Sequence, residues 1–306
     1  MNKSIVLAKS SHLFSNFDKN YFYQHTIKMT LEEIVKQALA EDIGEGDHTS
    51  MATIPEKATG KVQLVAKEDG ILAGIEVAAL VFKTVDPSIK IEMLAIDGKF
   101  IRKGQQLMVL EGNARSLLTA ERTALNFIQR MSGIATFTNK LVRQMDGYRT
   151  KLLDTRKTTP GNRLIEKMAV KMGGGHNHRF GLYDMILIKD NHVDFAGGVP
   201  NAINSTKEYL KKNKKDLKIE IEVRNFLELH EVLDTGGVDR ILFDNFSPDD
   251  LLTAVQIAGR KIEKEASGNI TLNNIREYAE TGVDFISVGA LTHQIKSLDM
   301  SLKAIK

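Results

Sequence analysis

The chain contains no cysteine at all among its 306 residues. This absence excludes disulfide bonds, thiolate nucleophiles, cysteine-ligated zinc and iron–sulfur clusters, and it fits a reducing compartment. No apolar run approaches the roughly 18 residues that a helix needs to span a bilayer. The net charge of +3 is too small to indicate a nucleic-acid partner, so any basic site must be local. We therefore expect a cytoplasmic protein that binds neither nucleic acid nor membrane.

The overall composition is that of a folded protein. Hydrophobic residues make up 42% of the chain and charged residues 26%, which is ordinary for a globular domain and excludes a disordered one. The length suits one large domain or a large and a small one. Residues 1–28 contain no Arg and no apolar run long enough for a signal peptide. We expect them to form a loose N-terminal extension.

Residues 29–130 predict a small α+β domain with a linking helix. Thr30 and Glu33 form a capping box at the start of a helix, and short β-like runs separated by Gly and Asp follow. Residues 69–74 and 98–105 are similar to the two halves of biotinyl and lipoyl carrier modules. A carrier needs a modified lysine, usually between two methionines, and the chain contains no Met-Lys-Met. We therefore interpret this similarity as structural.

The linking helix is predicted from Ala114 to about Met131, because apolar residues recur three and four positions apart. Arg122 lies well off this apolar stripe, so its side chain is free to reach outward. Taken alone, such an arginine indicates only a solvated helix face.

Residues 131–292 alternate strand-like and helix-like segments. This alternation predicts parallel strands joined by right-handed crossovers. The length is short for a complete (β/α)₈ barrel of about 250 residues, so we predict an α/β fold with a smaller or open parallel barrel. Residues 293–306 are expected to pack back on the N-terminal domain. The predicted strands are 151–153, 185–188, 218–221, 240–243, 261–264 and 285–288, and the clearest helices are 162–172, 226–234 and 248–259.

Charged, polar or glycine residues follow every predicted strand. Active sites of parallel barrels lie at these C-terminal strand ends, where side chains from separate loops converge. One such residue is usually an ordinary loop residue, but six in succession favour a functional ring. The ring consists of Asp154-Thr155-Arg156-Lys157, Lys189-Asp190-Asn191-His192, Glu222, Asp244-Asn245, Ser267-Gly268 and Gly289.

Residues 154–192 are rich in cations and glycine, with seven Lys or Arg, three His and five Gly. The glycine triplet 173–175 lets the backbone approach a ligand beside His178 and Arg179. Arg156, Arg179 and Lys189 would repel one another in one cavity unless anions neutralised them. Arginine suits carboxylates geometrically, and lysine acts as a point charge for phosphates. The sequence therefore predicts a small, multiply anionic substrate.

Five strings together resemble the quinolinate phosphoribosyltransferase family, the decarboxylating nicotinate-nucleotide pyrophosphorylases. They are EDIGEGDHTS, ERTALNFIQRMSGIAT, DTRKTTPGNR, GGGHNHRFGLYDMILIKDNH and ISVGALTH, and the resemblance runs from about Met29 to Lys306. It implies an open parallel β/α barrel of the type II phosphoribosyltransferase kind with a smaller N-terminal α+β sandwich domain. It also implies a glycosyltransferase that moves phosphoribosyl from phosphoribosyl pyrophosphate to the quinolinate nitrogen. Loss of the 2-carboxylate as carbon dioxide would then give nicotinate mononucleotide, for NAD biosynthesis.

The resemblance also assigns roles to the basic residues. The two quinolinate carboxylates would be held by Arg156, His178, Arg179 and Lys189. Lys157 would meet the pyrophosphate.

Further roles fall on the acidic and glycine residues of the ring. Glu222 and Asp244 would hold the ribose hydroxyls and the Mg²⁺ that accompanies the pyrophosphate, as hard oxygen ligands should. Ser267, Gly268 and Gly289 would bind the 5′-phosphate through backbone amides.

Arg122 would enter the neighbouring subunit's site, which implies a homodimer or a higher oligomer built from dimers. Two alternatives stay open at this point. A paralogous phosphoribosyltransferase of the same fold could share these strings and use a different acid. A non-catalytic anion-binding barrel would need no Glu222 or Asp244 for metal.

Overall fold

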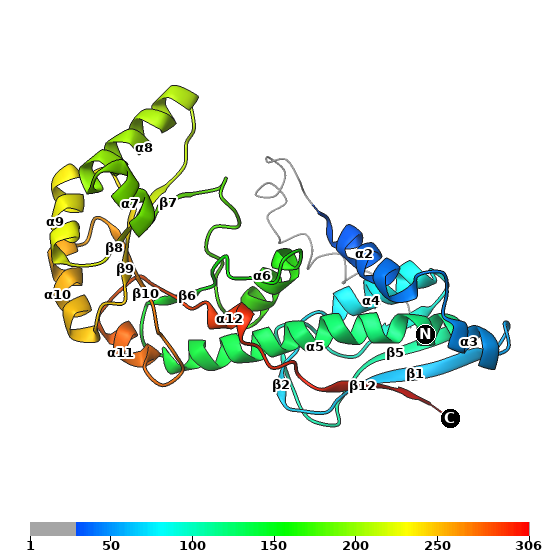
Figure 1. The fold of residues 1–306 in the computed structure, drawn as a ribbon. Coiled ribbons are helices and arrows are strands. Elements are labelled where there is room, and N and C mark those ends of the chain that lie inside the picture. Colours follow the sequence, from blue (N-terminus) through cyan, green and yellow to red (C-terminus); the bar gives the residue numbers. More distant parts are fainter. Residues whose placement is uncertain (1–28, 306) are drawn as a thin grey trace, which may run out of the picture.

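The computed structural model describes residues 29–305, so the predicted extension 1–28 lies outside them. These residues form two lobes joined by one long helix (Figure 1). No helix within 29–305 is both long and apolar enough to cross a membrane.

The N-terminal lobe is built on a four-stranded antiparallel sheet in the order β12-β1-β5-β3. The predicted capping box is confirmed at the first described helix, where the Glu33 amide donates to Thr30 Oγ1 (3.2 Å) and the Thr30 amide to Glu33 Oε2 (2.6 Å). The elements of this lobe are α2 (Leu31–Ile43), α3 (His48–Thr53), β1 (Thr59–Ala66), β2 (Gly70–Ile71), α4 (Ile75–Val85), β3 (Lys90–Met93), β4 (Phe100–Ile101), β5 (Gln106–Asn113) and β12 (Met300–Ala304).

Helix α4 begins after Gly74, which has no side chain to cap it. Asp97, from the turn between β3 and β4, caps the helix instead, and its Oδ1 accepts a hydrogen bond from the Ile75 amide (3.0 Å). Its other oxygen, Oδ2, is buried and finds no partner among the described residues. Burial therefore raises the pKa of Asp97 to about 6.

This raised pKa predicts a pH-dependent stability. The folded chain holds the Asp97 proton more tightly than the unfolded chain, so the contribution of Asp97 to stability falls as the pH rises through about 6. We expect the free energy of unfolding of the native chain, relative to Asp97→Asn, to fall by about 1–1.5 kcal/mol between pH 5 and pH 8. Urea unfolding at both pH values measures this difference, and a constant difference would contradict the prediction.

Helix α5 (Ala114–Gln144) connects the two lobes and lies against both (Figure 1). The predicted end near Met131 is wrong, because the helix continues to Gln144. Gly133 resembles a helix breaker in the sequence, but here it permits close packing: a Cβ on it would lie 2.4 Å from the Lys296 carbonyl oxygen. The boundary predicted between residues 130 and 131 thus falls within one continuous helix.

The C-terminal segment crosses back to the N-terminal lobe. Strand β12 pairs antiparallel with β1 from Val62↔Ala304 to Ala66↔Met300, and it forms one edge of that sheet.

The second lobe is a six-stranded parallel sheet in the order β6-β11-β10-β9-β8-β7, with helices between the strands. The predicted α/β fold is confirmed. Strands β6 and β7 occupy the two edges, and no ladder joins them within 29–305, so the sheet is open. Its elements are β6 (Lys151–Leu153), α6 (Arg163–Met172), β7 (Ile186–Ile188), α7 (Asp190–Ala196), α8 (Val199–Asn213), β8 (Ile219–Val223), α9 (Phe226–Thr235), β9 (Arg240–Asp244), α10 (Pro248–Ala258), β10 (Glu263–Ser267), α11 (Ile275–Glu280), β11 (Phe285–Ser287) and α12 (Ala290–His293).

Strand β8 alternates apolar and polar residues, and so shows that the sheet has an apolar and a charged face. In β8, Ile219, Ile221 and Val223 belong to the hydrophobic core, while Glu220 and Glu222 lie on the opposite face. Strands β9 and β10 place Arg240, Asp244, Glu265 and Ser267 on that same face. The sheet thus encloses a charged interior, whereas ordinary parallel barrels are filled with branched apolar side chains.

Candidate active site

Two arginines form the basic side of the candidate site. Arg156 follows β6, and its Nε is buried without a hydrogen-bond partner among the described residues. Arg179 is only 8% exposed, and its Nη1 donates to the Met185 carbonyl (3.1 Å). Burial lowers the pKa of Arg179, and the positive charge of Arg156 lowers it further, so the two guanidinium groups lie near enough to repel each other. Two adjacent cations and an unused buried donor are typical of an anion site.

Lys189 faces the acidic side of the site. It directly precedes α7, and its Nζ lies 3.7 Å from Glu222 Oε2. Burial raises the pKa of Glu222, Lys189 opposes that rise, and the charges of Asp244 and Asp190 add to it. Lys189, Glu222 and Asp244, which lie at or next to the C-terminal ends of three different strands, therefore act on one another electrostatically.

Hydrogen bonds connect the turn after β9 to the turn after β10, beside Asp244. The Asn245 side chain donates to Asp244 Oδ2 (2.8 Å), and the Asn245 amide donates to the Ser267 carbonyl (2.9 Å). Gly268 has φ +97°, and a Cβ there would lie 2.2 Å from Asn245 Oδ1. Only glycine fits this position without displacing the asparagine. Asn269, which we did not predict as a site residue, donates to Asn245 Oδ1 (3.0 Å).

Lys157 lies at the opposite side of the ring, against Gly289. A Cβ on Gly289 would come within 3.0 Å of Lys157 Cδ and 3.1 Å of His293 Nε2. Lys157 is exposed, so its ammonium group is accessible to a ligand. The ends of β6 and β11 thus bring together a lysine, a histidine and a close backbone approach, which suits a phosphate group.

His178 points into the interior of the sheet. Its Nδ1 accepts a hydrogen bond from the Arg179 amide (2.7 Å), and its Nε2 lies 3.0 Å from Glu220 Oε2 and 3.5 Å from Glu265 Oε2. The acceptor role of Nδ1 places the ring proton on Nε2. His176 forms a bridge with Leu153 of edge strand β6, and His178, two residues further on, reaches carboxylates on β8 and β10, so the sheet must curve around its charged face.

We did not predict from the sequence the cluster of charged residues, Glu220, Glu265 and Arg240, on the inner face of the parallel sheet. Burial raises the pKa of both Glu220 and Glu265 to about 7. Arg240 Nη1 lies 2.8 Å from Glu265 Oε2 and stabilises its charge. The strict alternation in β8 was the sequence signal for Glu220, because Glu220 and Glu222 share one face. His178, Glu220 and Glu265 also form the one group of three within 29–305 whose geometry could hold a metal ion.

Arg122 lies apart from these residues, exposed on the first half of α5. Within 29–305, no hydrogen bond or ion pair connects it to Arg156, Lys189 or Glu222. The described chain therefore brings the strand-end residues together and leaves Arg122 outside their cluster.

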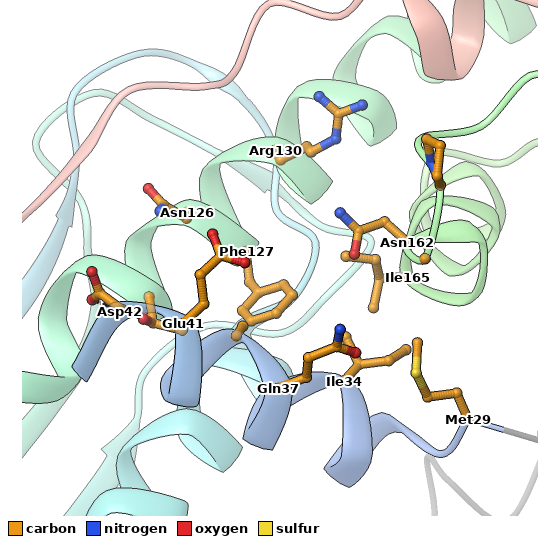
Figure 2. Close-up of a pocket in the computed structure, with 14 residues that line it drawn as sticks. Met29, Ile34, Gln37, Glu41, Asp42, Asn126, Phe127, Arg130, Asn162 and Ile165 are labelled. Atoms are coloured by element: carbon orange, nitrogen blue, oxygen red, sulfur yellow. Dashed lines mark hydrogen bonds between the residues drawn. The ribbon is translucent and has the colours of Figure 1, made fainter. Parts of the chain in front are cut away.

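A separate pocket of about 410 Å³ lies between α2, α5 and the start of α6 (Figure 2). Figure 2 shows Arg130 of α5 and Asn162 of the β6–α6 loop on its walls. None of the predicted ring residues lines this pocket. Pro160 and Gly161, from the loop that carries Arg156 and Lys157, also line it.

These observations define the class of protein: an open β/α barrel whose strand ends place cations opposite carboxylates. Two family models match the chain, the N-terminal domain of quinolinate phosphoribosyl transferase over residues 47–132 and its C-terminal domain over residues 134–303. The chain belongs to the quinolinate phosphoribosyltransferase family.

Individual relatives agree with this assignment. A nicotinate-nucleotide pyrophosphorylase (carboxylating) of Arabidopsis thaliana is 45% identical over 288 residues, covering 89% of this chain and 82% of its own. A quinolinate phosphoribosyltransferase (decarboxylating) of Nicotiana tabacum is 46% identical over the same length, with the same coverage. The solved nicotinate-nucleotide pyrophosphorylase of Francisella tularensis superimposes with a TM-score of 0.84 at 45% identity, covering 90% of this chain and 96% of its own.

Proposed function

We propose that this protein transfers the phosphoribosyl group of phosphoribosyl pyrophosphate to the nitrogen of quinolinate, with loss of the 2-carboxylate as carbon dioxide. The products are nicotinate mononucleotide and pyrophosphate, which places the enzyme in NAD biosynthesis. The observation that carries the proposal is a pair of mutually repelling arginines in a chain of this family: Arg156, whose Nε is buried without a partner among the described residues, and Arg179, which is 8% exposed. A dicarboxylate neutralises such a pair.

The arrangement of charges suits this reaction. Breaking the bond between ribose and pyrophosphate develops positive charge on the sugar and negative charge on the leaving group. Glu222 and Asp244 would lie on the sugar side, and Lys157 would face the leaving group. Ser267, Gly268 and Gly289 would hold the 5′-phosphate. The ribosylated ring nitrogen is cationic and accepts the electrons of the departing carboxylate, so decarboxylation needs no protein base.

A magnesium ion fits the acidic side of the site. The charge of Asp244 contributes to the raised pKa of Glu222, so the two carboxylates repel each other. A divalent cation held by Glu222 and Asp244 would relieve this repulsion, and carboxylate oxygens are the ligands that Mg²⁺ prefers. When bound with substrate, Mg²⁺ would neutralise charge on the pyrophosphate.

A direct assay tests the proposal. The protein is incubated with quinolinate, phosphoribosyl pyrophosphate and Mg²⁺, and nicotinate mononucleotide is measured by chromatography with mass detection. Reactions that lack one substrate, or that contain excess chelator, serve as controls. Ligand binding without product would favour a non-catalytic barrel, and product only with another acid would favour the paralogous enzyme.

The proposed enzyme is a homodimer, or an oligomer of dimers, in which Arg122 completes the partner's site. The exposed position of Arg122, outside the strand-end cluster of its own chain, supports this arrangement. The cytoplasmic location stays a prediction from the sequence, and the names of some plant relatives place them in chloroplasts or mitochondria.

Mixing two inactive variants tests the shared site. We expect Arg122→Ala and Lys189→Ala each to be nearly inactive alone. In a mixed dimer, one site combines a native Lys189 with the partner's native Arg122, and the other site lacks both. Random exchange makes half the dimers mixed, so about a quarter of all sites should regain activity.

Subunit exchange is monitored by mass spectrometry with one variant isotopically labelled. No recovery despite exchange would place Arg122 in its own subunit's site. An active Arg122→Ala variant would remove this arginine from the site.

A further inference from the structure

The loop 154–162 between β6 and α6 carries both Arg156 and Lys157. Two other arginines, from two different helices, contact this loop. Arg130 approaches it from α5, and Arg163 approaches it from the start of α6. Neither belongs to the predicted ring of strand-end residues.

Arg130 fixes the side of the loop that carries Lys157. Its Nε and Nη2 donate to Glu166 Oε1 (2.9 and 2.6 Å), and Nη2 also donates to Thr159 Oγ1 (2.8 Å) and to the Thr292 carbonyl (3.1 Å). Glu166 is fully buried, and its second oxygen accepts from the Thr159 amide (3.1 Å). One arginine–carboxylate pair therefore joins α5, α6, α12 and the loop.

Thr292, which contacts Arg130 through its carbonyl group, also contacts Lys157. Its side chain is fully buried, and its Oγ1 donates to the Lys157 carbonyl (2.7 Å). Thr292 belongs to α12, which begins directly after Gly289. The contacts of Arg130 thus fix Lys157 relative to Gly289, the two groups that would meet the phosphates of phosphoribosyl pyrophosphate.

Arg163 fixes the other side of the loop. Its Nε donates to Thr158 Oγ1 (3.0 Å), its Nη1 to the Phe180 carbonyl (2.9 Å) and its Nη2 to the Arg156 carbonyl (3.4 Å). Phe180 directly follows Arg179. Arg163 therefore ties together the backbones that carry the two guanidinium groups proposed for the quinolinate carboxylates.

We propose that Arg130 and Arg163 are positioning residues for different substrates, Arg130 for phosphoribosyl pyrophosphate through Lys157, and Arg163 for quinolinate through Arg156 and Arg179. The inference rests on the proposed function. In this proposal neither arginine binds substrate, because the contacts described for both are with groups of the protein. Arg130 instead lines the separate pocket of Figure 2, where its side chain is 31% exposed.

Two matched substitutions separate these roles. Thr292→Val removes the hydroxyl that donates to Lys157, and Thr158→Val removes the hydroxyl that accepts from Arg163. We expect Thr292→Val to raise the KM for phosphoribosyl pyrophosphate about five- to tenfold, with the KM for quinolinate changed by less than about twofold. Thr158→Val should give the reverse pattern. Each KM is measured with the other substrate saturating, and thermal unfolding is measured for both variants.

A merely structural role would lower stability or kcat without favouring one substrate. Equal changes in both KM values, or no change in either, would overturn the inference. If Thr292→Val does not fold, the two KM values are compared in Arg130→Lys and Arg163→Lys instead. Each of these variants keeps the positive charge and loses the planar guanidinium group with its several hydrogen-bond donors. A native chain that turns over no quinolinate would instead contradict the proposed function.

Discussion

Nicotinate is expected to be turned over with a kcat/KM at least about 10⁴-fold lower than that of quinolinate. Nicotinate lacks the 2-carboxylate, so it would leave part of the buried basic side unpaired. The Arg156 Nε is buried and has no partner among the described residues, and Arg179 is 8% exposed, so donors left unpaired there would be costly. Initial rates for both acids, at saturating phosphoribosyl pyrophosphate, measure this ratio.

The variant Arg156→Lys serves as the control for this discrimination. It keeps the positive charge but loses the planar guanidinium group that can bind a carboxylate with two hydrogen bonds. The kcat/KM for quinolinate should therefore fall, and the ratio of kcat/KM for quinolinate to that for nicotinate should become smaller. Comparable turnover of nicotinate and quinolinate by the native protein would contradict the assignment. A silent Arg156→Lys variant would argue against bidentate carboxylate binding by this residue.

Lys189→Ala is expected to reduce kcat/KM by at least about 10²-fold. Folding should change little, because the lysine side chain is 49% exposed and its described ion pair with Glu222 is long, at 3.7 Å. Lys189 lowers the pKa of Glu222, so its removal should raise that pKa further. Any residual activity that needs ionised Glu222 should therefore move to higher pH, which a profile of kcat/KM against pH measures.

Lys211→Ala is a matched control for the same change of residue. Lys211 is exposed in the last turn of α8, outside the strand-end ring, so its loss should leave kcat/KM and its pH profile unchanged. Near-normal activity of soluble Lys189→Ala would show that Lys189 does not bind substrate.

The strand-end residues were predictable because parallel strands end at one edge of a sheet whatever the details of packing. In the structure, Lys189, Glu222 and Asp244 are close enough for the charges of Lys189 and Asp244 to shift the pKa of Glu222. Each of the three lies at or next to the end of a strand that the hydrophobic runs had predicted. The length of α5 was not predictable in this way. Gly133 is a poor helix former, and only the approach of the Lys296 carbonyl explains why glycine occupies that position.

The charged interior was harder to predict because it depends on contacts between distant segments. The alternation in β8 places Glu220 beside Glu222 on one face, but it cannot show that His178 and Glu265 meet it there. The contacts of Arg130 with Thr159, Glu166 and Thr292 likewise join three separate parts of the chain. No local pattern marks such residues.

Strand β12 imposes an order on folding during synthesis. Residues 300–304 form one edge of a sheet whose other strands lie between residues 59 and 113, so the whole parallel lobe is translated before this edge can pair. Until then β1 presents an unpaired edge, the kind of surface on which other chains can add. A nascent chain whose synthesis stops inside the parallel lobe would therefore expose this edge of β1. The N-terminal sheet can be completed only after residue 304 has been synthesised.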